Sequence, residues 1–108
     1  MPIKAVEKQI TLLIRLLENA LRSGYNVQQS LELATKELPS PLLEEMLQTI
    51  EEIKSGTNPL DALSNWARRS SNPDVDLVVA TFHVQMEVGG NLADKLNLLG
   101  QILEHRSK

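Results

Sequence analysis

The chain has 108 residues and a formal net charge of −3, and it contains no cysteine. It can therefore form neither a disulfide nor a cysteine-based metal site, and it has no thiol nucleophile. The acidic balance and an aromatic content of only 3% argue against nucleic-acid binding, which normally uses a basic surface and aromatic stacking platforms. No apolar run reaches the ~18 residues of a membrane-spanning helix, and no signal peptide is expected.

The first third of the chain predicts two helices, over about 4–23 and 27–38. In the first, Ile10 and Leu17 belong to a set of apolar residues with the three-and-four spacing of a buried stripe. Asn26 is expected to cap the second helix, because its side-chain oxygen can accept a bond from an unpaired backbone N–H.

The middle third predicts helices over about 41–55 and 59–70, after a break at two prolines. We expect Ser40 to cap the third helix and Pro41 to lie in its first turn. Leu47 is expected to face the core because it shares a face with other apolar residues of this helix.

The last third predicts helices over about 73–88 and 92–106. The first of these is apolar over most of its circumference. Its β-branched residues would also suit a strand, but its length and its Asn-Pro start favour a helix, which we predict to be central and buried on several sides. Gly100 lies in the middle of the last helix, and close approach of another helix would explain it.

Short connections (joints) between the expected helices, each with a glycine and an asparagine two residues later, recur at nearly even spacing along the chain. A glycine suits the left-handed conformation just past a helix end, and an asparagine suits the start of the next helix. The joint residues are Gly24, Asn26, Gly56, Asn58, Gly89, Gly90 and Asn91. The spacing is close to that of tetratricopeptide repeats, but their motif is missing. We therefore predict an all-α fold over 1–108: a single six-helix bundle built from three antiparallel helical hairpins.

A polar stripe interrupts the apolar helix over 73–88. Asp76, His83 and Glu87 are seven and four residues apart, which brings them to one helix face. They can form a solvent-facing edge with a local ion pair, or they can bind a divalent metal ion and support a metal-dependent activity. The solvent-facing edge is the favoured interpretation.

Two charged surfaces are candidate partner-binding sites. The third helix carries an acidic set that is either a solvated face or a docking surface for a basic partner: Glu44, Glu45, Glu51 and Glu52. Arg68 and Arg69 follow Trp66 at the end of the fourth helix. They either complement the helix dipole or contribute to a partner contact.

Nothing in the chain favours catalysis. Its only histidines are His83 and His105, and it has no phosphate-binding loop. We therefore expect no enzymatic activity and no cofactor.

Several segments, in order along the chain, resemble the type II secretion F domain. Leu21–Leu31 is similar to the family's L-R-[AS]-G-[YL]-[NS]-x-x-x-A-L, and Leu38–Leu42 to the L-P-x-P-L of TadB-like members. Gly56–Leu63 is similar to G-x-x-x-x-E-A-L, with an aspartate in place of the glutamate. Glu87–Leu96 is similar to E-x-G-G-N-L-A-E-x-L, which is the most specific match. His105 and Arg106 occupy the place of an R-x-R that precedes membrane helices.

The resemblance implies a role that neither composition nor periodicity could give. The chain would be the cytoplasmic domain of a multi-pass inner-membrane platform protein, closest to the TadB type, for Tad or type IV-like pilus assembly or type II secretion. Such a platform is a non-catalytic scaffold that couples a secretion ATPase to pilin movement. Its partners would be the ATPase, pilin and other platform subunits, and we expect a homodimer. Glu87, which matches the family's motif, would have a structural role at the Gly89–Gly90 turn.

The chain departs from the family in lacking transmembrane helices and the L-P-D-A-L segment expected before the first helix. We interpret it as an excised domain. The alternative is a free-standing soluble helical adaptor that binds a basic partner protein. Apolar spans encoded after Lys108 would support the platform interpretation.

Overall fold

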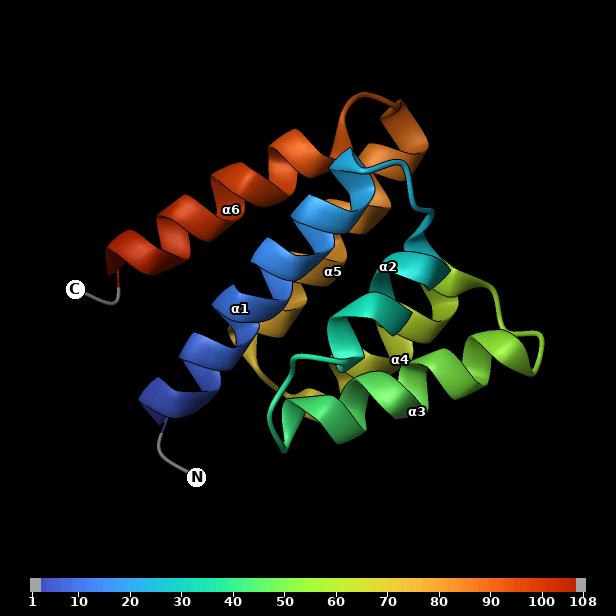
Figure 1. Ribbon diagram of the computed structural model, residues 1–108, viewed down its shortest axis with the longest axis horizontal. Coiled ribbons are helices and arrows are strands. Elements are labelled where there is room, and N and C mark those ends of the chain that lie inside the picture. The colour runs from blue at the N-terminus through green and yellow to red at the C-terminus, as the bar shows by residue number, and fades with distance from the viewer. Residues whose placement is uncertain (1–2, 107–108) are drawn as a thin grey trace.

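A computed structural model describes residues 3–106, and over these residues the chain forms six α-helices and no strand (Figure 1). The helices are α1 (Ile3–Arg22), α2 (Val27–Thr35), α3 (Leu42–Lys54), α4 (Pro59–Ser70), α5 (Pro73–Val88) and α6 (Leu92–Arg106). The predicted all-α class and the six-helix bundle are confirmed.

Helices that follow one another in the chain pack together, and the pairs include α1 with α2, α3 with α4 and α5 with α6. The most extensive contact, however, joins α1 to α6, from opposite ends of the chain. Figure 1 shows α6 running beside α1 in the opposite direction, with α5 behind α1. The bundle thus has two groups of three helices: α1, α5 and α6 in one, and α2, α3 and α4 in the other.

One hydrophobic core links both groups. Trp66 of α4 and Phe82 of α5 are its largest side chains, and Ile10 and Leu17 of α1 are fully enclosed with them. Leu47 was expected in this core, but it is 49% exposed. It lies on the outer side of α3, while Met46 and Ile50 face inward, so the predicted orientation of Leu47 was wrong.

The prediction that 73–88 is buried on several sides was also wrong. Val75, Val78 and Phe82 are buried, but Leu77 is 45% and Val84 51% exposed. The reason is that α5 packs against α4, α6 and, more lightly, α1, and these neighbours cover only part of its circumference. An apolar surface remains uncovered along the whole helix.

The break between α2 and α3 differs from the prediction. α2 ends at Thr35, three residues before the expected end, and Leu38 tucks into the core from the connecting segment. Ser40 does not cap α3, because its hydroxyl bonds the carboxylate of Glu44. Gln9 of α1 provides the side-chain hydrogen bonds at the start of α3 instead. Its Oε1 accepts from Leu42 N (3.3 Å), and its Nε2 donates to Ser40 O (3.0 Å). The start of α3 is therefore held from another helix.

The three joints have a common geometry. Glycines with positive φ stand at Gly24 (97°), Gly56 (111°), Gly89 (80°) and Gly90 (103°). Each asparagine side chain then accepts a backbone N–H of the next helix: Asn26 from Gln29 (2.8 Å), Asn58 from Leu60 (2.9 Å) and Asn91 from Asp94 (3.0 Å). These bonds satisfy donors that a helix start otherwise leaves unpaired.

Candidate interaction surfaces

The polar stripe on α5 is divided between two environments. His83 Nε2 lies 2.8 Å from Ser64 Oγ, so the imidazole is hydrogen-bonded to α4. Asp76 and Glu87 are exposed. Among the described residues, no three histidine, aspartate or glutamate side chains gather closely enough to hold a metal ion. The structure thus gives the metal hypothesis no support.

The acidic residues of α3 do not all face solvent. Glu45 Oε1 accepts from Trp66 Nε1 (2.7 Å) and from Ser70 Oγ (2.8 Å). The indole of Trp66 is fully buried, and a buried N–H without an acceptor is costly. Glu45 therefore contributes to the contact between α3 and α4.

Glu52 of α3 and Arg69 of α4 also bond each other, and Arg68 bonds a neighbouring side chain of its own helix. Glu52 accepts from Arg69 Nη1 and from Asn65 Nδ2, each at 2.8 Å, and Arg68 bonds the side chain of Asn65. Glu44 is exposed although it bonds Ser40, and Glu51 is exposed as well. The acidic surface available to a partner is consequently narrower than the sequence indicated.

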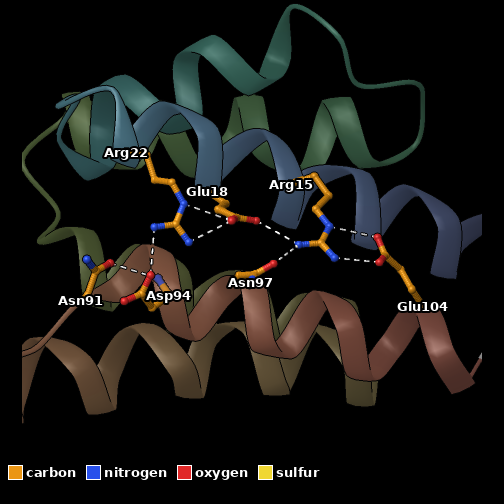
Figure 2. A network of polar contacts seen from close by, with 7 residues as sticks. All are labelled: Arg15, Glu18, Arg22, Asn91, Asp94, Asn97 and Glu104. Carbon is orange, nitrogen blue, oxygen red and sulfur yellow. Dashed lines mark hydrogen bonds and ion pairs between the residues drawn. The ribbon is translucent and has the colours of Figure 1, made fainter.

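The largest polar network lies between α1 and α6, and sequence reasoning missed it (Figure 2). Arg15 donates hydrogen bonds to both carboxylate oxygens of Glu104, from Nε at 3.0 Å and from Nη2 at 2.7 Å. Its Nη1 donates to Glu18 Oε1 (2.9 Å) and Asn97 Oδ1 (2.7 Å). The hydrogen bonds to Glu104 are the main reason that the pKa of Arg15 is raised, and burial opposes them.

Arg22 extends the network by one turn of α1. It donates to Glu18 Oε2 and, at 2.9 Å, to Asp94 Oδ1 of α6 (Figure 2). Asp94 is the residue whose backbone N–H is capped by Asn91. The end of α1 is thereby fastened to the α5–α6 turn.

Gly100 is explained by this network. A Cβ at this position would lie 3.0 Å from Arg15 Cζ and 3.2 Å from Arg15 Nη1. The expected close approach is thus made by the Arg15 side chain. A methyl group at residue 100 would press on a guanidinium that is held on several sides.

The end of α6 has its own attachment. Arg106 Nη2 donates to Asp74 Oδ2 at 2.6 Å and lies 4.0 Å from Glu7 Oε1. Asp74 is buried at the start of α5, and its hydrogen bond raises the pKa of Arg106. Arg106, which the resemblance placed in a membrane-proximal motif, therefore ties α6 to α5 and α1.

The apolar surface left uncovered on α5 continues onto α6. Leu77 and Val84 of α5 and Leu98 and Ile102 of α6 are between 45% and 55% exposed. A shallow groove runs between the two helices and is lined by these four residues and by Thr81, Gln85 and Lys95 among others. We call the surface formed by Leu77, Val84, Leu98 and Ile102 the α5–α6 face.

The family model that matches the chain over residues 13–108 is described as type II secretion system (T2SS), protein F. The match covers most of the sequence, and the chain therefore belongs to this family of secretion-system components. No curated protein and no solved structure matches the chain. None of the helices in residues 3–106 is both long and apolar enough to cross a membrane.

The most specific motif, Glu87–Leu96, forms the turn from α5 to α6. The turn is closed by Gly89 N, which donates to Gln85 O at 2.8 Å. The Glu87 side chain is exposed near this turn. Its structural role remains a prediction.

Proposed function

We propose that the chain is the cytoplasmic domain of an inner-membrane platform protein, of the TadB type, for pilus assembly or type II secretion. In this proposal the full-length protein is a multi-pass membrane protein and the domain lies on the cytoplasmic face. The domain is a non-catalytic scaffold that couples a secretion ATPase to pilin movement. Family membership over residues 13–108 is the observation that carries the proposal.

The arrangement of charged groups supports a scaffold. Arg15, Arg22, Arg69 and Arg106 all bond carboxylates on neighbouring helices. Their charges therefore hold helices together. Contacts with other proteins would use the outer surfaces, which include exposed carboxylates on α3 and the α5–α6 face.

Membrane fractionation and co-purification of the tagged full-length protein test the proposal. We expect recovery in the inner-membrane fraction together with a secretion ATPase. Recovery without the ATPase from a soluble fraction would overturn the platform role and favour an adaptor.

We propose that the ATPase meets the remaining acidic surface of α3. Glu51 is exposed there, and a basic partner surface would complement it. Glu51→Lys is expected to reduce ATPase recovery severalfold. Glu37→Lys, an exposed substitution of the same charge change beyond α2, is the matched control. Equal recovery with both variants would remove α3 from the contact.

We also propose that the platform contains two copies of this domain. A homodimer would bring two identical surfaces to the other components.

A further inference from the structure

The α5–α6 face is a contiguous apolar strip on the surface of the bundle. Its four large side chains come from two helices that pack together, and each is about half exposed. Exposed apolar residues are ordinary when scattered, but a contiguous group bounded by polar residues marks an interaction site. The charges within and beside the strip indicate the chemistry of its occupant.

A cation lies inside the strip. Lys95 of α6 lines the groove together with Gln85 of α5, near the turn that joins the two helices, and the apolar residues of both helices flank it. Among residues 3–106, Lys95 has no ion-pair partner. A wholly apolar occupant would bury this ammonium group unpaired, which is costly. The occupant therefore needs a carboxylate opposite Lys95.

One edge of the strip is acidic and lies on α5. Asp76, His83 and Glu87 form a row along this helix, and the two carboxylates are exposed. The hydrogen bond between His83 and Ser64 of α4 shows that the row lies on the α4 side, away from α6. Basic side chains of an occupant would complement this edge.

The opposite edge lies on α6 and is acidic too. Asp94 is exposed there, and its ion pair with Arg22 of α1 places it on the α1 side of the helix (Figure 2). It follows that Asp94 points away from the groove, about 100° around the helix axis from Lys95. Across the strip, the charges thus run from acidic through basic to acidic.

The length of the strip suits a helix. Leu77 and Val84 are seven residues apart on α5, as are Lys95 and Ile102 on α6, which corresponds to ~10 Å along either axis. A helix that docks in a groove uses apolar anchors at i, i+3 or i+4 and i+7, which cover the same length. A small ligand fits less well, because this groove is shallow and small-molecule sites enclose most of the ligand. An anionic membrane surface would be repelled by both acidic edges.

We propose that the α5–α6 face binds an amphipathic helix of a partner protein, with a carboxylate in its apolar stripe and lysine or arginine on its flanks. The apolar stripe lies along the groove and its carboxylate pairs with Lys95. The basic flanks face Asp76 and Glu87 on one side and Asp94 on the other. A second copy of the same face would not match, because its central charge is also Lys95. Either a platform or an adaptor can use such a site, so it does not depend on the proposed function.

Fluorescence anisotropy with a synthetic peptide is the first test. The probe is a labelled helical peptide of about 18 residues, with leucines at i, i+4 and i+7, a glutamate at i+11 and lysines on both flanks. We expect the 108-residue chain to bind it about tenfold or more tightly than the same peptide with lysine in place of the glutamate. The net charge of −3 alone would favour the lysine peptide. Equal binding of both peptides, or no binding at ~1 mM chain, would overturn the proposal.

Charge reversal at residue 95 tests which group meets the carboxylate. Lys95→Glu should weaken binding of the glutamate peptide by about tenfold and strengthen binding of the lysine peptide. Lys36→Glu, the same charge change at an exposed residue just after α2, is the matched control and should change either dissociation constant by less than about twofold. Equal losses with the two variants would show general electrostatic attraction and refute the pairing.

Truncation of an apolar side chain tests the groove. Leu98→Ser should weaken binding of the glutamate peptide by about fivefold or more. Leu47→Ser on α3, at 49% exposure against 51% for Leu98, is the matched control and should leave binding unchanged. The peptide should shift amide resonances of α5 and α6, and shifts centred on other helices would place the contact elsewhere and overturn the site. Circular dichroism checks that each variant is folded.

Two other occupants would refute the inference. If phosphatidylethanolamine–phosphatidylglycerol vesicles displace the peptide and Leu98→Ser abolishes vesicle binding, the occupant is lipid. If the chain self-associates in sedimentation velocity and Leu98→Ser abolishes the association, the occupant is a second copy. Each result can be obtained whichever fraction contains the full-length protein. Failure of the helix site and failure of the platform role are therefore separable.

Discussion

The sign of the stability change at Gly100 should depend on Arg15. In an ordinary helix interior, alanine is favoured over glycine by about 1 kcal/mol. Here the added Cβ would lie 3.0 Å from Arg15 Cζ, 3.2 Å from Nη1 and 3.3 Å from Nε. The guanidinium cannot move away without lengthening its bonds to Glu104, Glu18 or Asn97.

The magnitude follows from these opposing effects. Hydrogen bonds to charged groups contribute about 1.5–3 kcal/mol each when well formed, and less here because Arg15 and Glu104 are partly exposed. Distorting one or two of them should outweigh the gain in helix propensity. We expect Gly100→Ala to destabilise the wild-type protein by about 1 kcal/mol. In an Arg15→Ala background it should stabilise the protein by about 1 kcal/mol.

The assay is a double-mutant cycle from urea unfolding followed by circular dichroism, with the four proteins compared at equal denaturant slope. The expected coupling between the two substitutions is about 2 kcal/mol. If Gly100→Ala changes the free energy of unfolding equally in both backgrounds, the Arg15 side chain is not what excludes a methyl group at this position.

Three further substitutions or conditions test other contacts. Trp66→Phe removes the indole donor to Glu45 and should lower the free energy of unfolding by about 1–3 kcal/mol in urea titration. A loss below about 0.5 kcal/mol would show that this hydrogen bond does not stabilise the contact between α3 and α4. Met46→Ala should lower the free energy of unfolding by about 2–5 kcal/mol in the same assay, whereas Leu47→Ser at the adjacent position should change it by no more than about 0.5 kcal/mol. Equal losses would place both side chains in the core. The pKa of Arg15 is raised in the folded state, so its stabilisation is fully present below the unfolded-state value and is lost only at still higher pH. The stability difference between wild type and Arg15→Ala, measured by thermal melting, should therefore be constant from about pH 7 to about pH 10, and a decline across that range would show that another group titrates.

The local features of the fold were predictable because they depend on residues close in sequence. Asn58 and Gly56 carry their own conformational preferences, and the end of one helix and the start of the next follow from them. Apolar periodicity likewise placed the stripe of α1. Such signals need no knowledge of which helix packs on which.

The contacts between helices were not predictable in the same way. Glu45 lies on the charged side of α3 by periodicity, and only the position of α4 reveals that it accepts from Trp66. Arg15 and Glu104 are far apart in sequence, and nothing local pairs them. The exposed side of α5 was wrongly predicted for the same reason. Apolar residues indicate that a helix face is suited to burial, but they do not identify the element that packs against it.

The pairing of α1 with α6 has a consequence for biosynthesis. Arg15 leaves the ribosome before its partners Asn97 and Glu104, which follow it by 82 and 89 residues. Until α6 has been made, the side of α1 that packs against α6 is exposed. A nascent chain would depend on chaperones to shield this surface. The bundle can therefore close only after α6 has been synthesised, and a chain terminated before α6 should be prone to aggregation.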